Sequence, residues 1–153
     1  MIHIIITAYG EPKSTEQCIN SIIKQNIKIP YKIIVSDPFT ETKWMLEEKF
    51  PNNKNIEYFE DEDKGKSYAL NQLLKKFYSK NKEDILIFTD GDVFLEDNSI
   101  NSIIDSFNDL KIGGVCSSLI SINPRNNMYG YWSHLAFDEM NKTRSKLSKE
   151  NLS

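Results

Sequence analysis

The sequence has little of several features that would place a protein in a class at once. Its longest apolar runs, residues 4–6 and 85–88 among them, are far shorter than the roughly 20 residues that a membrane-spanning helix needs. No basic stretch precedes the first apolar run, so we expect no signal peptide. Lys and Arg number 19 against 22 Asp and Glu, and a net charge of -3 gives no positive field to attract nucleic acid. These absences predict a cytoplasmic protein with no transmembrane segment and no nucleic-acid partner.

Cysteine, arginine and the common glycine-rich motifs are also scarce. Cys18 and Cys116 each stand alone in an apolar segment, which favours small core residues over a disulfide or a metal pair. Arg125 and Arg144 are the only arginines in the sequence, so lysine must make most cationic contacts. The sequence has no dinucleotide fingerprint, no phosphate loop of the Walker type and no nucleophile elbow. A dinucleotide site is therefore not expected.

What the sequence does contain is a regular alternation of apolar segments. Its 153 residues, 39% of them hydrophobic, suit one domain with a core of ordinary size. Runs of β-branched residues predict strands, and apolar residues at helical spacing predict helices. The expected strands cover residues 2–7, 31–36, 55–59, 85–89 and 115–122, and the expected helices 15–26, 40–50, 64–77, 97–107 and 129–147. Because strand and helix alternate five times, we predict an α/β fold with a mostly parallel sheet covered by helices on both faces.

The pattern also predicts local details. The fourth strand is uniformly apolar, as a central parallel strand must be when helices cover both faces. Ser14 with Gln17 three residues later has the pattern of a capping box for the first helix. Thr40 can cap the second helix, and Asp97 or Asn98 the fourth.

The strongest candidate for chemistry is Asp90-Gly91-Asp92, which directly follows the fourth predicted strand. Ligands of such sheets bind outside the carboxyl ends of the strands. Two carboxylates separated by one small residue can both reach a hard divalent cation, which commonly keeps open positions for substrate phosphates. Asp61 and Asp63 have the same spacing but lie in a charged loop, where a metal role is less favoured. The structural alternative for Asp90 and Asp92 is a turn at the entry to a helix.

Other polar residues follow strands at the same edge of the predicted sheet. Asp37, after the second strand, can accept a hydrogen bond from a base or a ribose hydroxyl. Gly65 and Lys66 open the third predicted helix, whose free amide groups attract anions. The loop after the first strand can hold a base or ribose through Thr7, Ala8, Tyr9 and Glu11. Each of these features has a plain alternative as a connecting loop, a turn or a solvated helix end.

Taken in order, these segments resemble the nucleotide-sugar-binding half of the inverting family two glycosyltransferases, which have the Rossmann-like GT-A fold. The resemblance covers residues 2–122 and rests on Thr7-Ala8-Tyr9-Gly10-Glu11, Ser36-Asp37-Pro38-Phe39-Thr40, Gly65-Lys66-Ser67-Tyr68-Ala69-Leu70-Asn71 and Phe88-Thr89-Asp90-Gly91-Asp92-Val93. It implies that the first loop and Asp37 hold the uridine of a UDP-sugar, and that Gly65 and Lys66 line the nucleotide pocket. It also implies that Asp90, Gly91 and Asp92 hold the ribose and a Mn²⁺ or Mg²⁺ ion on the diphosphate.

The resemblance also divides the chain. Residues 1–123 would form the nucleotide-sugar-binding core, and residues 124–153 a helical extension that begins an incomplete acceptor-binding region. The late carboxylates Asp138 and Glu139 match no motif of the family, so we expect the catalytic base to lie outside this chain. We therefore expect a C-terminally short GT-A domain, from a truncated protein, that binds a nucleotide sugar and transfers little of it alone. The acceptor is unassigned, and peripheral contact with a membrane stays open.

Other classes remain as alternatives. Asp90-Gly91-Asp92-Val93 also resembles the first motif of haloacid-dehalogenase-type phosphatases, in which the first Asp is the nucleophile, although that motif usually begins its domain. A non-catalytic module that binds a nucleotide or a partner would keep UDP affinity without metal dependence. A receiver domain is less favoured, because its acidic cluster would have to lie near the first strand, where no carboxylate precedes Glu11.

Overall fold

The computed structural model describes residues 1–77 and 83–151 of the chain. The chain divides into two compact units, Met1–Asp109 and Leu110–Ser153. This boundary lies ahead of residue 123, the predicted end of the nucleotide-binding core. The functional assignment of the two parts stays a prediction.

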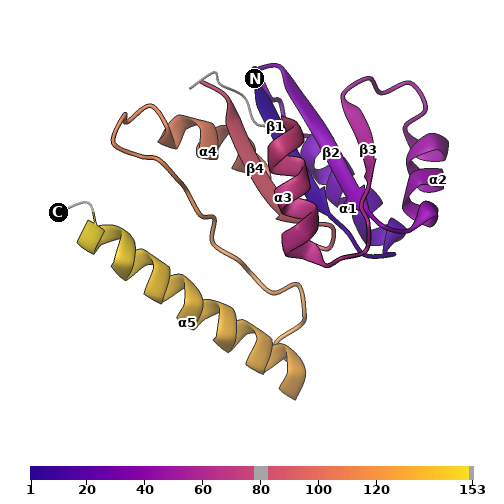
Figure 1. Cartoon of the computed structure of the whole chain (residues 1–153). Helices are drawn as coiled ribbons and strands as arrows, with labels where there is room; N and C mark the ends of the chain where they lie inside the picture. Colours follow the sequence, from indigo (N-terminus) through magenta and orange to yellow (C-terminus); the bar gives the residue numbers. More distant parts are fainter. Residues whose placement is uncertain (78–82, 152–153) are drawn as a thin grey trace. The chain divides into compact units, whose positions relative to one another are not determined.

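The first unit contains a four-stranded parallel sheet (Figure 1). Its strands are β1 (Ile2–Thr7), β2 (Tyr31–Asp37), β3 (Ile56–Glu60) and β4 (Ile85–Asp90), in the order β3-β2-β1-β4. Thr7 at the end of β1 is the register partner of Ser36 in β2 and of Asp90 in β4. The carboxyl ends of these three strands therefore meet at one edge of the sheet, as the sequence predicts.

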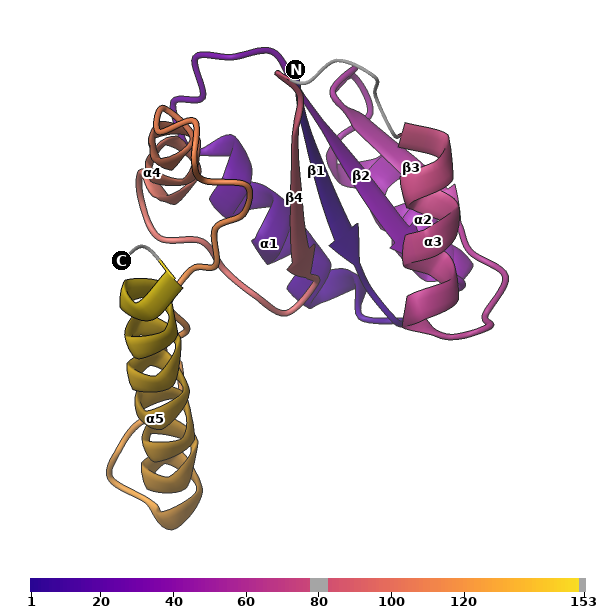
Figure 2. The ribbon, with the colours of Figure 1, turned by 60° about the vertical axis from the view of Figure 1, so that its left-hand side comes forward.

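Helices cover both faces of this sheet. Side chains alternate along a strand, so Ile4 and Ile6 of β1 point to one face and Ile5 to the other. The core on the first face includes residues of α1 (Pro12–Ile23), α2 (Thr40–Lys49) and α4 (Ser99–Ser106), whereas Leu73 of α3 (Lys66–Phe77) packs on the second. Figure 2 shows α1 and α4 on one side of the strands and α3 on the other. The predicted α/β fold, a parallel sheet covered by helices on both faces, is confirmed.

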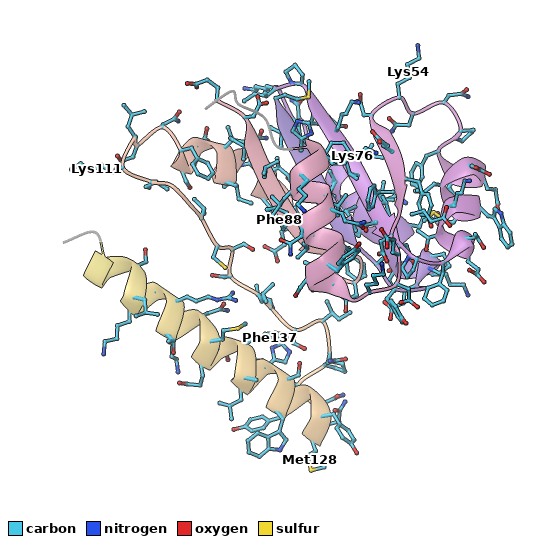
Figure 3. The ribbon with its side chains drawn as sticks, in the orientation of Figure 1. Lys54, Lys76, Phe88, Lys111, Met128 and Phe137 are labelled. Carbon is cyan, nitrogen blue, oxygen red and sulfur yellow. The ribbon has the colours of Figure 1, made fainter. Side chains whose placement is uncertain are left out.

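The expected central position of the fourth strand is wrong. In the part of the chain that the structure describes, β4 pairs with β1 alone and is an edge strand. Phe88 of β4, labelled in Figure 3, is 47% exposed, although its register partner Ile5 is fully buried. A continuous apolar run shows that both faces can be buried, but it does not fix the place of a strand in the sheet.

The fifth predicted strand, residues 115–122, is also wrong. Across the described residues this segment belongs to no sheet, and Ile120 and Ile122 are exposed. Side chains of α5 (Met128–Asn151) bind its backbone instead: Asn141 accepts from the N–H of Leu119 at 3.1 Å and donates to its carbonyl at 2.7 Å. A side-chain amide thus satisfies the backbone groups that a neighbouring strand would otherwise bind. Cys116 in this segment is exposed, so its predicted core role is wrong, whereas Cys18 is buried as expected.

The helix starts differ from the predicted caps. α1 begins at Pro12, three residues before the expected start, and its N-cap Glu11 makes no side-chain cap bond, so the capping box at Ser14 is wrong. Proline is favoured at a first helical position because it needs no hydrogen-bond acceptor there. Thr40 is the first residue of α2 and not its cap. Asn98 is the N-cap of α4, in agreement with one of the two predicted positions.

No helix in the described ranges is long and apolar enough to cross a membrane.

Candidate functional site

A pocket of about 220 Å³ lies at the carboxyl edge of the sheet. Segments that are distant in the sequence form it, namely the loop after β1, the loop between β3 and α3, and the turn after β4. Nine of the ten predicted site residues line it: Thr7, Ala8, Tyr9, Glu11, Gly65, Lys66, Asp90, Gly91 and Asp92. The sequence pattern therefore brings these residues to one place, as the sheet-edge rule predicts.

Asp90 is the centre of the polar contacts in this pocket. Its Oδ1 accepts a hydrogen bond from Oγ1 of Thr7 at 3.0 Å and forms an ion pair with Nζ of Lys66. Lys66 is the first residue of α3, and the side chains of Lys66 and Asp90 are both about half exposed. An exposed ion pair contributes little to stability, so a ligand can separate these two groups at low cost.

Gly91 lets the turn after β4 approach the first loop closely. Its N–H donates to the carbonyl of Thr7 at 2.8 Å. A Cβ at this position would lie 2.9 Å from Oγ1 of Thr15 and 3.1 Å from Cβ of Ala8. Because Thr15 is fully buried, it has little freedom to move away. The small residue between the two aspartates is thus required by packing.

We expect Gly91→Ala to lower the free energy of unfolding by about 1–3 kcal/mol, the usual cost of overpacking. The matched control is Gly113→Ala, because no atom lies within 4 Å of a Cβ built there. Urea unfolding followed by circular dichroism measures both variants. Equal stability of the two variants would contradict the proposed close approach.

Asp37 is the one predicted site residue that does not line the pocket, and its expected contact with a base or ribose stays a prediction. It is fully buried, and its two carboxylate oxygens accept hydrogen bonds from Oγ1 of Thr42 at 2.6 Å, from the N–H of Phe39 at 2.9 Å and from the N–H of Gly10. Tyr9, next to Gly10, stacks edge-on against Phe39 with ring centroids 4.9 Å apart. The carboxylate of Asp37 therefore positions the first loop and does not itself face the pocket.

Sequence reasoning missed Asp61, Asp63 and Ala69, which also line the pocket. Oδ2 of Asp61 accepts from Oγ of Ser36 at 3.3 Å, and Oδ1 accepts from the N–H of Asp63 at 2.8 Å. The charge of Asp63 is the largest cause of a raised pKa of Tyr9. The charge of this loop made a metal role less favoured, but the loop immediately precedes Gly65 and Lys66, and that position is the signal in the sequence that places it near the pocket.

Cys18 of α1 lies beneath the same turn. Its Sγ is 3.7 Å from the carbonyl oxygen of Asp90. Burial, followed by the charges of Asp92 and Asp90, raises the pKa of Cys18 to about 12. The thiol therefore stays protonated at neutral pH and is no nucleophile there.

We expect Cys18 of the folded protein to resist alkylation by iodoacetamide up to about pH 9, because the thiolate is the reacting form. The exposed Cys116 serves as the internal control and should react readily. Mass spectrometry of the digested protein reports each site. Rapid modification of Cys18 at neutral pH, at the rate seen for Cys116, would contradict the raised pKa.

The pocket offers part of a cation site. Asp90 and Asp92 both line it, and carboxylate oxygens are the ligands that Mg²⁺ and Mn²⁺ favour. Among residues 1–77 and 83–151, no group of three His, Cys, Asp or Glu side chains could hold a metal ion. The residues present therefore fit a cation that takes its remaining ligands from a bound diphosphate and water, as Mg²⁺ commonly does.

The four-stranded parallel sheet with helices on both faces matches the Rossmann-like fold of the GT-A type. The model of the family "Glycosyl transferase family 2" matches residues 3–151, and the chain belongs to this family. This membership does not favour the phosphatase or receiver alternatives.

Two solved structures have the same fold: the crystal structure of S. aureus TarS 1-349 and that of S. aureus TarS. Each is 20% identical to this chain, with a TM-score of 0.53 over 78% of it. The chain covers 39% of the first and 24% of the second. No curated protein matches the sequence.

Proposed function

We propose that this chain binds a UDP-sugar together with Mn²⁺ or Mg²⁺, and that it acts in an inverting enzyme that transfers the sugar to an acceptor. Membership of glycosyl transferase family 2 supports a nucleotide-sugar donor. The observation that carries the proposal is the pocket itself, where Asp90, Asp92 and Lys66 lie beside the loop after β1. The carboxylates of Asp90 and Asp92 suit a cation, and the ammonium of Lys66 suits the diphosphate that the cation accompanies.

Different residues of the pocket would bind the uridine and the diphosphate of the donor. Tyr9 and Glu11 of the first loop would contact the uridine, with Asp37 behind them holding the loop in place. Lys66 and the free amide groups at the start of α3 would meet the diphosphate. Asp90 and Asp92 would hold the cation, which stabilises the charge that develops on the leaving diphosphate.

In this proposal Lys66 has one partner in the protein alone and another when the donor is bound. In the protein alone its ammonium neutralises Asp90. When Asp90 holds a cation, the Lys66 ammonium would be available to a phosphate oxygen of the donor.

The catalytic base and the acceptor site are assigned outside this chain. The proposal rests on the absence of a family motif around the late carboxylates Asp138 and Glu139, whose exposed ion pairs with Arg125 at 3.3 Å and Lys142 at 2.6 Å do not decide the question. A general base must reach the acceptor hydroxyl. We include a cytoplasmic location in the proposal and leave the acceptor and the sugar unnamed.

Isothermal titration calorimetry of the full chain tests this function. We expect UDP to bind in the presence of Mn²⁺, to bind much more weakly with EDTA, and to bind at least about tenfold more tightly than ADP, which is about 1.4 kcal/mol. Affinity for UDP that is the same with EDTA would refute the metal role. Equal affinity for ADP and UDP would refute the uridine specificity.

A further inference from the structure

A second cavity lies apart from the donor pocket. It is an open groove of about 880 Å³ between β3 and one flank of α3, and Figure 3 labels Lys76 on this helix. Its volume lies within the range of ligand sites in proteins. The two cavities share no lining residue. The groove is lined by Phe59, Tyr68, Asn71, Gln72, Lys75 and Lys76.

The uncharged lining combines aromatic rings with carboxamides. Tyr68 is 38% exposed, and Phe59 of β3 is half-buried. Nε2 of Gln72 donates to Oε1 of Glu62 at 2.6 Å, but its Oε1 is buried and, within the described residues, accepts no hydrogen bond. A buried acceptor without a partner costs free energy. The Nε2–Glu62 bond fixes the orientation of the Gln72 amide, so its remaining N–H is the group that a ligand hydroxyl can meet.

The charged lining leaves one cation unbalanced. Nζ of Lys76 pairs with Oε1 of Glu57 at 2.8 Å and lies 5.2 Å from the ring centre of Phe59. Lys75, one residue earlier, has no ion pair or side-chain hydrogen bond to any residue in the ranges that the structure describes.

Glu62, whose carboxylate accepts from Tyr68 and Gln72, is paired with Lys64. The groove therefore offers one unbalanced ammonium group, that of Lys75, to an anionic ligand.

We propose that this groove binds an acidic oligosaccharide, with a sugar ring against Tyr68, its hydroxyls on Asn71 and Gln72, and a carboxylate or other anionic group on Lys75. Sugars present apolar C–H faces and many hydroxyl groups, which match aromatic rings and carboxamides. Nucleic acid would need several phosphate contacts, and this groove has a single unbalanced cation on a chain of net charge -3. This binding goes beyond the proposed donor site and requires neither nucleotide nor metal.

The test is an NMR titration of the ¹⁵N-labelled full chain with a hexamer of α-1,4-linked galacturonic acid, without nucleotide. We expect the amide signals of residues 59–76 to shift and saturate in the millimolar range. Lys75→Gln and Tyr68→Ala should each weaken binding about fivefold, the effect of one hydrogen bond or contact of ordinary strength. Lys43→Gln, an exposed lysine of α2, should leave the affinity unchanged.

Four results would overturn the proposal. The first is that the acidic hexamer shifts no signal of the groove. The second is that sodium sulfate at equal charge shifts the same signals, which would indicate a simple anion site. The third is that neutral maltohexaose binds equally well, and the fourth is that Lys43→Gln and Lys75→Gln weaken binding equally.

Discussion

Asp92→Asn is expected to abolish most of the metal-dependent affinity for UDP while leaving the fold intact. The side chain is exposed in the pocket, so its replacement should change the free energy of unfolding by less than about 0.5 kcal/mol. Residues that only orient a metal ligand commonly contribute 10–100-fold to metal affinity, so loss of a ligand should cost at least about 100-fold. Calorimetry with UDP and Mn²⁺ measures the loss.

The matched control for this substitution is Asp105→Asn on α4, which is also exposed but lies outside the pocket. It should bind UDP and Mn²⁺ as the unmodified protein does. With EDTA present, the Asp92 variant and the unmodified protein should bind UDP almost equally, because the carboxylate acts through the cation. A variant that kept its affinity in the presence of Mn²⁺ would show that Asp92 is no metal ligand.

Asp37→Ala is expected to produce the largest loss of stability. The carboxylate accepts hydrogen bonds from the N–H groups of Gly10 and Phe39 and from the hydroxyl of Thr42, and all three donors lose their acceptor. At about 1 kcal/mol for each ordinary hydrogen bond, the free energy of unfolding should fall by about 3 kcal/mol. Urea unfolding followed by circular dichroism measures the difference.

The same variant separates positioning from direct contact with the ligand. If Asp37 acts through the first loop, its removal should also weaken UDP binding about tenfold, or about 1.4 kcal/mol, with or without Mn²⁺. Asp97→Ala, at an exposed residue ahead of α4, is the control and should change neither property. Stability within about 0.5 kcal/mol of the unmodified protein would contradict the role assigned to Asp37.

Strand identity and the place of the site could be predicted because they depend on local patterns. Apolar runs ended by polar residues identified all four strands of the sheet, and parallel pairing then brought Thr7 next to Asp90. Where the local pattern is compatible with more than one structure, contacts with distant segments determine which one forms. Residues 115–122 have the composition of a strand, but Asn141 of α5 binds the backbone of Leu119 instead.

The sequence predicts most residues that line the pocket but not the direction in which each side chain points. Residue type and position after a strand are visible in the sequence, whereas the direction of a side chain is not. Asp37 is the last residue of β2, one residue beyond the predicted end of that strand, and its side chain turns inward to bind the loop after β1. Asp61 and Asp63 appear as part of a charged run, yet the turn before α3 directs them toward the pocket. The directions of these side chains depend on contacts between segments that are far apart in the sequence.

The central claim is that Asp90 and Asp92 hold a cation that bridges to a diphosphate. The most direct measurement is a crystal structure of the full chain grown with UDP and Mn²⁺, with anomalous scattering recorded for manganese. We predict an anomalous peak within about 2.3 Å of a carboxylate oxygen of Asp92 and of a diphosphate oxygen, with uracil beside Tyr9. A pocket without nucleotide or manganese, with Lys66 still paired to Asp90, would contradict the account.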